Sequence, residues 1–181
     1  QREIFYYSLE LITKNLQSLS EEGLPKQKQS NPSPIKMILF DLDGTLLPMD
    51  LPLFKQTTSL LFIEKMKKHG YDLEILRKAR TEAFKAMASN DGKQLNSEAF
   101  YDVLETYYGE KLAEDYHYFD EYYDEEFDKV KEICGFHPDA GPTVAAIAEK
   151  GYQLVLATMP WFPAAGIKAR LRWAGVDHRH F

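Results

Sequence analysis

The chain has 181 residues, of which 44% are hydrophobic and 28% charged, and this fits one domain, or a core with a smaller satellite, but not two unrelated enzymes. A formal net charge of -6 argues against a nucleic-acid partner, because neutralising phosphates requires a clustered basic surface. No apolar run approaches the ~20 residues of a membrane span, and the single cysteine, Cys134, fits a reducing compartment; we therefore expect a cytoplasmic protein with no membrane partner.

The first 34 residues are predicted to form an amphipathic helix and a linker. Apolar residues repeat at steps of four and three on one helical stripe: Phe5, Leu9, Ile12, Leu16 and Leu19. We expect this helix to dock on an upstream domain or a partner, with a coiled coil as the alternative. Gly23 ends the predicted helix, and the polar, proline-punctuated residues 24–34 are typical of a linker.

Two apolar runs predict strands of a parallel sheet. Residues 35–40 are almost continuously apolar, and residues 152–157 form a second run after a predicted helix over 143–150 that Gly151 ends. Continuous apolar runs are typical of strands that are buried on both faces. The order of helix, glycine and buried strand predicts an α/β fold.

The segment between these strands is predicted to be wholly helical, over 54–69, 72–89, 97–108 and 111–132. Gly70, Gly92 and Gly109 mark the ends of the first three of these helices. An insert of this size predicts a separate helical subdomain, a cap, over the carboxyl end of the sheet, where open α/β folds bind ligands. The expected organisation is helix and linker 1–34, core 35–52, helical cap 53–136 and core 137–181.

Two carboxylates, Asp41 and Asp43, follow the first predicted strand and precede Gly44 and Thr45. At the end of a strand, Asp41 is placed to act as a nucleophile that forms an aspartyl-phosphate. Asp43, on the turn, is placed to protonate the leaving oxygen and then to activate water. Carboxylates repel a phosphate dianion, so a divalent cation is required between them, and Mg2+ suits oxygen ligands. Gly44 allows the sharp turn and leaves backbone N–H groups near the phosphoryl oxygens.

The segment from Asp41 to Leu46, directly after an apolar strand, resembles the first motif of the haloacid dehalogenase superfamily. The resemblance implies a Rossmann-like parallel core with an inserted helical cap. It also implies that Asp41 is the nucleophile and a metal ligand, and that Asp43 is the acid/base and a ligand through its backbone carbonyl. An acid at the second position resembles the phosphatase branch of the family.

Residues 154–159, which end in Thr158 and Met159, resemble the second motif of the same family. The resemblance implies that the Thr158 hydroxyl and the Met159 backbone N–H bind a phosphoryl oxygen. Met159 departs from the usual Asn and removes any side-chain hydrogen bond at that position. The alternative role for Thr158 is a helix N-cap.

The third motif of the family is a Lys and the fourth an acidic pair, and both normally lie beyond the helix that follows the second motif. That helix is predicted over 164–174, and the chain ends at Phe181. We therefore expect a truncated chain that is nearly inactive alone. Lys168 is not assigned as the missing Lys, because with Arg170 and Arg172 it reads as an ordinary solvated helix face.

The predicted function is a magnesium-dependent phosphatase of a small phosphorylated metabolite. Alternatives are a non-catalytic binding module with the same fold, and a nucleotide-sugar glycosyltransferase with an Asp-x-Asp metal site, which residues 44–46 disfavour. Trp161 and Phe162 are predicted either to wall the pocket or to pack in a core. His178 and His180 are expected to be exposed and not to bind a metal.

Overall fold

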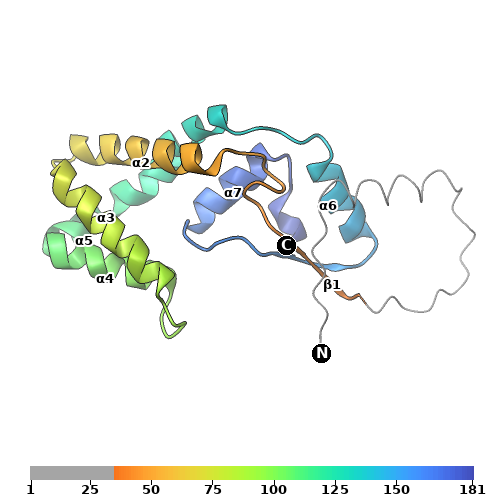
Figure 1. Cartoon of the computed structure of the whole chain (residues 1–181), viewed down its shortest axis with the longest axis horizontal. Helices are drawn as coiled ribbons and strands as arrows, with labels where there is room; N and C mark the ends of the chain where they lie inside the picture. Colours follow the sequence, from red (N-terminus) through yellow and green to blue (C-terminus); the bar gives the residue numbers. More distant parts are fainter. Residues whose placement is uncertain (1–34) are drawn as a thin grey trace, which may run out of the picture. The chain divides into compact units, whose positions relative to one another are not determined.

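The computed structural model describes residues 35–181, so the helix and linker expected over residues 1–34 lie outside the described residues. The fold is mixed α/β, mostly helical with a two-stranded parallel sheet. It divides into two compact units (Figure 1). Unit 1 contains residues 35–49, Cys134–Thr158 and Arg170–Phe181, and unit 2 contains Asp50–Ile133 and Met159–Ala169. No helix in residues 35–181 combines the length and hydrophobicity that a membrane span requires.

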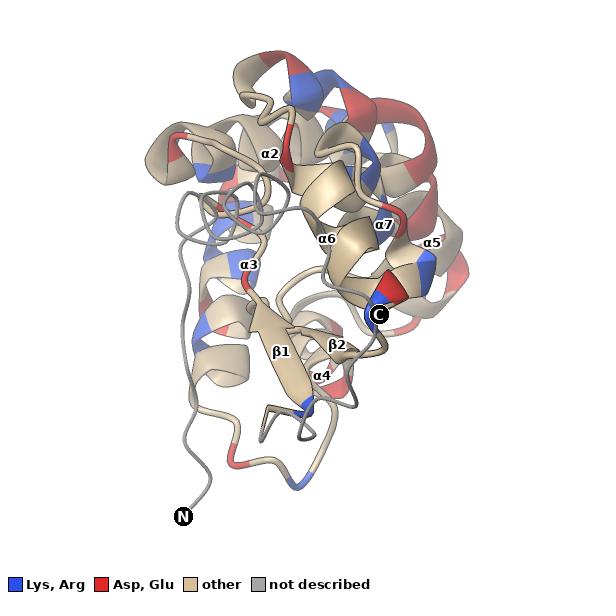
Figure 2. Ribbon diagram, turned by 90° about the vertical axis from the view of Figure 1, so that its right-hand side faces the viewer, with Lys and Arg blue, Asp and Glu red and all other residues tan. Residues whose placement is uncertain are grey.

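The sheet of unit 1 pairs β1 (Met37–Phe40) with β2 (Gln153–Leu156) in parallel, with Phe40 opposite Leu156. Figure 2 shows the two strands side by side and without charged residues. The pairing continues past the strands, since the Ala157 N–H donates to the Phe40 carbonyl at 2.7 Å. The expectation of strands buried on both faces is wrong: Phe40 and Leu154 are buried, but Met37 is 44% exposed. With two strands in the described sheet, each has an open edge.

Three helical elements complete unit 1: α6 (Ala140–Glu149), the last residues of α7 (Ala164–Trp173) and a 3-10 turn, η3 (His178–His180). Helix α6 starts earlier than predicted, and Gly151 follows it with φ +82°, as its predicted role requires. A Cβ on Gly141 would lie 2.2 Å from the Gly175 carbonyl oxygen, so glycine is needed where these backbones meet.

Unit 2 contains α2 (Leu51–Lys68), α3 (Leu73–Ala88), α4 (Asn96–Tyr108) and α5 (Glu110–Glu121). Helices α3 and α4 pack against each other (Figure 1). Asp50 caps α2 by accepting from the Leu53 N–H at 2.9 Å, and Asp72 caps α3 through the N–H groups of Glu74 and Ile75. The predicted helices over 54–69, 72–89 and 97–108 therefore exist, with small differences at their ends.

The single helix predicted over 111–132 is wrong. Helix α5 ends at Glu121 and is followed by a π turn, η1 (Tyr122–Glu126), and a 3-10 segment, η2 (Phe127–Ile133). The Phe127 N–H donates to the Tyr122 carbonyl, five residues earlier. This wider turn brings Tyr122 and Phe127 to one face, where their ring centroids lie 5.9 Å apart. Burial of both rings thus overrides the regular helix.

Aromatic rings form the core of unit 2. Phe62 packs edge-on against Phe119 and Tyr122, and Phe54 contacts Phe127 and Phe162. Trp161 lies against Phe84, and Lys55 lies over the Trp161 ring. Of the two roles predicted for Trp161 and Phe162, these contacts support packing in a core.

Candidate active site

The loop that follows β1 holds the two candidate carboxylates on a tightly bonded turn. The Leu42 carbonyl accepts from the N–H groups of Thr45 and Leu47, at 3.2 and 2.9 Å. Leu42, Leu46 and Leu47 are fully buried, and this anchors the loop in the core of unit 1. Asp41, Asp43 and Thr45 lie between these anchors, so their positions are fixed by packing as well as by hydrogen bonds.

Asp41 is the exposed member of the pair. Its Oδ2 accepts a hydrogen bond from the Thr45 hydroxyl at 3.0 Å. This bond orients the carboxylate and leaves Oδ1 for other partners. An exposed, oriented carboxylate at a strand end meets the first requirement of a nucleophile, which is access to its substrate.

Asp43 is held by Arg170, which the sequence analysis had placed on a solvated face. The Arg170 guanidinium donates from Nη1 to Asp43 Oδ2. Arg170 is 0% exposed and the Asp43 side chain 16% exposed, so this ion pair is largely shielded from water. Asp43 Oδ1 is buried and has no hydrogen-bond partner in the described structure. One oxygen of Asp43 is therefore fixed by a cation, and the other is uncommitted.

A sequence signal for the burial of Arg170 does exist. Gly166, Ala169, Arg170 and Trp173 are all buried, and they repeat at steps of three, one and three along α7. This spacing places Arg170 on the apolar stripe of the helix. Lys168 and Arg172 are exposed, as predicted for a solvated face.

Thr158 lies just beyond β2, at the same edge of the sheet as Asp41. The register sets Phe40 opposite Leu156, and the carboxyl ends of parallel strands meet at one edge. The Thr158 hydroxyl is buried and has no hydrogen-bond partner in residues 35–181. Helix α7 begins only at Ala164, so the alternative of Thr158 as its N-cap is wrong. A buried hydroxyl without a partner is uncommon and calls for an explanation, and a ligand that accepts its hydrogen bond would provide one.

Gly44 and Met159 are the other two residues predicted to bind the phosphoryl group of the substrate. Gly44 has φ +83°, and its N–H donates to the Leu47 carbonyl at 2.9 Å, so this N–H serves the turn. Met159 belongs to unit 2, and its side chain is 57% exposed. The conformation of Gly44 is the one that the sharp turn was predicted to need.

A magnesium ion would find few protein ligands here. No group of three or more His, Cys, Asp or Glu side chains in residues 35–181 is arranged to hold a metal. Magnesium usually keeps several waters and takes one or two protein carboxylates. The exposed Asp41 carboxylate fits that need, whereas Arg170 occupies one oxygen of Asp43. The described residues therefore fit part of a magnesium site.

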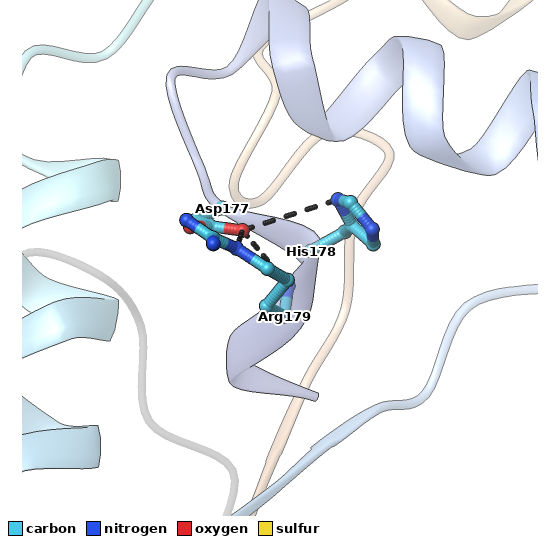
Figure 3. A network of polar contacts seen from close by, with 3 residues as sticks. All are labelled: Asp177, His178 and Arg179. Carbon is cyan, nitrogen blue, oxygen red and sulfur yellow. Dashed lines mark hydrogen bonds and ion pairs between the residues drawn. The ribbon is translucent and has the colours of Figure 1, made fainter.

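His178 takes part in a separate network of polar contacts with Asp177 and Arg179 (Figure 3). Asp177 caps η3 through the Arg179 N–H at 3.0 Å, and its carboxylate also accepts from the Arg179 side chain. His178 Nδ1 lies 3.9 Å from Asp177 Oδ1. Hydrogen bonds from Arg179 hold the pKa of the Asp177 carboxyl well below its usual range. These contacts give Asp177 and Arg179 a role in starting the 3-10 turn η3.

Comparison of the chain with protein-family models finds no match, and comparisons with curated proteins and with solved structures find none either. Function is therefore inferred from the residues of unit 1 themselves: an oriented nucleophile candidate, a fixed carboxylate and an uncommitted hydroxyl at one sheet edge.

Proposed function

We propose that this chain carries the catalytic aspartates of a magnesium-dependent phosphatase of the haloacid dehalogenase superfamily, acting on a small phosphomonoester. The observation that supports it best is the pairing of β1 with β2, which sets Asp41 and Thr158 at one sheet edge. The nucleophile and a phosphate-binding hydroxyl need this adjacency. In this proposal unit 1 is part of a Rossmann-like core and unit 2 is the helical cap.

In the first step, an Asp41 carboxylate oxygen attacks phosphorus and the bond from phosphorus to the ester oxygen breaks. The Asp43 carboxyl gives its proton to the departing alkoxide. The Thr158 hydroxyl donates to a phosphoryl oxygen, whose charge grows in the transition state. Thr45 keeps the attacking carboxylate in place through its bond to Asp41 Oδ2.

In the second step, the Asp43 carboxylate takes a proton from water, and the resulting hydroxide attacks phosphorus. The bond from phosphorus to the Asp41 oxygen breaks, which releases inorganic phosphate and restores both carboxyl groups. Because Arg170 holds Oδ2 of Asp43, we assign both proton transfers to Oδ1. Arg170 is thus a positioning residue for the acid/base.

Magnesium, when bound, offsets the repulsion between the Asp41 carboxylate and the phosphate dianion. The residues that would hold it are Asp41, through its carboxylate, and Asp43, through its backbone carbonyl. The second contact leaves the ion pair of Asp43 with Arg170 intact.

The proposal is tested by hydrolysis of an aryl phosphate by the full-length protein. We expect turnover with added Mg2+, its loss with a chelator, and a decrease of at least about 10³-fold in Asp41→Asn. Asp91→Asn is the matched control, because Asp91 is an exposed loop residue whose one ion pair within residues 35–181 is with Lys93. Full activity of Asp41→Asn would refute the nucleophile, and a folded protein without any turnover would favour the non-catalytic binding module.

A further inference from the structure

Unit 2 contains a buried cation that lacks an anionic partner. Arg80 lies on the inner face of α3 and is only 8% exposed. Its Nη1 donates to the hydroxyl and the carbonyl of Ser59, at 3.0 and 3.5 Å. No carboxylate within residues 35–181 forms an ion pair with it. A buried charge is normally paired, because its removal from water is costly.

Aromatic rings surround the Arg80 guanidinium. Its Cζ lies 4.3 Å from the ring centroid of Phe62 and 5.5 Å from that of Phe84. These rings stabilise the cation without neutralising it. Burial lowers the pKa of Arg80 to about 10, and the nearby Tyr123 and Tyr122 oppose that shift only in part. The cationic form is therefore less stable here than in water, yet it is still the form present at neutral pH.

The hydrogen bonds to Ser59 leave the other edge of the guanidinium without an acceptor among residues 35–181. Ser59 occupies Nη1, whereas Nε is buried and has no acceptor among the described residues. The Nε and Nη2 groups of an arginine form a fork that matches the two oxygens of a carboxylate or phosphate. Ser59, Phe84 and Tyr123, which lie beside Arg80, are half-buried, whereas Arg80 itself is 8% exposed.

We propose that Arg80 is the centre of a binding site in unit 2 for a small oxyanion, a carboxylate or phosphate group, which it grips through Nε and Nη2. Ser59 fixes the rotation of the guanidinium, and the rings of Phe62 and Phe84 exclude water from its face. The bound anion supplies the negative partner that no carboxylate among residues 35–181 provides to Arg80. This site shares no residue with the candidate active site and does not depend on the proposed function.

Arginine side-chain NMR on the full chain tests the site directly, with inorganic phosphate and acetate as probes at constant ionic strength. We expect the Arg80 Nε–Hε signal, identified by its loss in Arg80→Lys, to shift and saturate with one or both probes. The relative size of the two responses tells phosphate from carboxylate preference. An Arg80 signal that stays unmoved, or that moves no more than the signal of the exposed Arg77, would overturn the proposal.

Paired variants provide a second readout. Phosphate is expected to raise the melting temperature of the wild type and of Arg77→Met. In Arg80→Met we expect the affinity for phosphate to fall by at least about tenfold, which corresponds to the loss of charge-assisted hydrogen bonds from one guanidinium. Asp41→Asn separates this site from unit 1 and is expected to retain the Arg80 response. If Arg80→Met does not fold, the NMR titration of the wild type decides alone. An unchanged phosphate affinity in a folded Arg80→Met would contradict the site.

Discussion

The Arg170 guanidinium, fully buried on α7, donates a charge-assisted hydrogen bond to the carboxylate of Asp43, 127 positions earlier in the chain. The bond joins the loop after β1 to the helix that follows β2. It therefore links the two segments from which we propose the site is built. Such a pair fixes geometry more than it adds stability, because both charges are desolvated to form it.

Breaking this pair is expected to be costly. Arg170→Met leaves Asp43 without its cation, and we predict a loss of about 3 kcal/mol in the free energy of unfolding. Lys168→Met is the matched control, since Lys168 lies on the same helix but is exposed, and it should change stability by less than about 0.5 kcal/mol. Urea unfolding measures both. Equal losses in the two variants would show that the ion pair has no special role.

A double-mutant cycle isolates the pair itself. With Asp43→Asn and Arg170→Met, we predict a coupling energy of about 1–3 kcal/mol, the range for residues in direct contact. Additive effects of the two substitutions would contradict the contact between Arg170 and Asp43.

The elements of the fold were largely predictable, because their signals are local. The glycine that ends α6 and the apolar runs of β1 and β2 can be read from the neighbouring residues. The π turn at Tyr122 was not, since it depends on the packing of Tyr122 and Phe127 against rings distant in the sequence. Tertiary packing overrides helical periodicity at that point.

The candidate site was predictable only in part, for a related reason. Asp41, Asp43 and Thr158 follow predicted strands, so their common edge follows from the parallel pairing. The burial of Arg170 requires knowing which face of α7 packs inward, and its partner is far away in the sequence. Attention to the apolar stripe that includes Ala169 and Trp173 would have identified it.

Substitutions of Thr158 distinguish a phosphate-binding role of its buried hydroxyl from a role in packing. Since it has no partner in the described structure, Thr158→Val should leave the free energy of unfolding within about 0.5 kcal/mol of the wild type. The same change should lower kcat/KM for an aryl phosphate by about 10²-fold, the usual effect of one lost donor. Thr158→Ser keeps the hydroxyl and should restore most activity. A large loss of stability together with unchanged kinetics would assign Thr158 to packing instead.

Lys65 is expected to stabilise unit 2 to an extent that depends on pH. It is buried, and its Nζ lies 2.7 Å from Glu125 and 3.1 Å from Glu126. Burial opposes the charge of Lys65, but the hydrogen bonds that it donates to these glutamates raise its pKa above 10.5. The bond to Glu125 also lowers the pKa of that carboxyl below 4.5. The stabilisation that Glu125 provides is present above pH 4.5 and is lost as pH falls through its lowered pKa. The stabilisation that Lys65 provides is present below pH 10.5 and is lost as pH rises through its raised pKa.

Lys65→Met should therefore destabilise the protein at neutral pH, by about 1–3 kcal/mol given the partial exposure of the glutamates. The difference from the wild type should shrink as pH falls through the lowered pKa of Glu125, where that carboxylate becomes protonated. Lys67→Met, an exposed position on the same helix, is the control. Thermal unfolding across this range measures the effect. A difference that persists undiminished at low pH would show that Lys65 acts by packing alone.

The central claim, that Asp41 becomes phosphorylated, is tested most directly by chemical trapping. Full-length protein is mixed with a phosphomonoester and Mg2+, quenched in acid, and reduced with borohydride, which converts a phosphorylated aspartate to homoserine. Peptide mass spectrometry then locates the change. We predict homoserine at position 41, dependent on substrate and Mg2+, and its absence in Asp41→Asn. Homoserine at position 43 instead, or turnover without modification at either position, would contradict the assignment of Asp41 as the nucleophile.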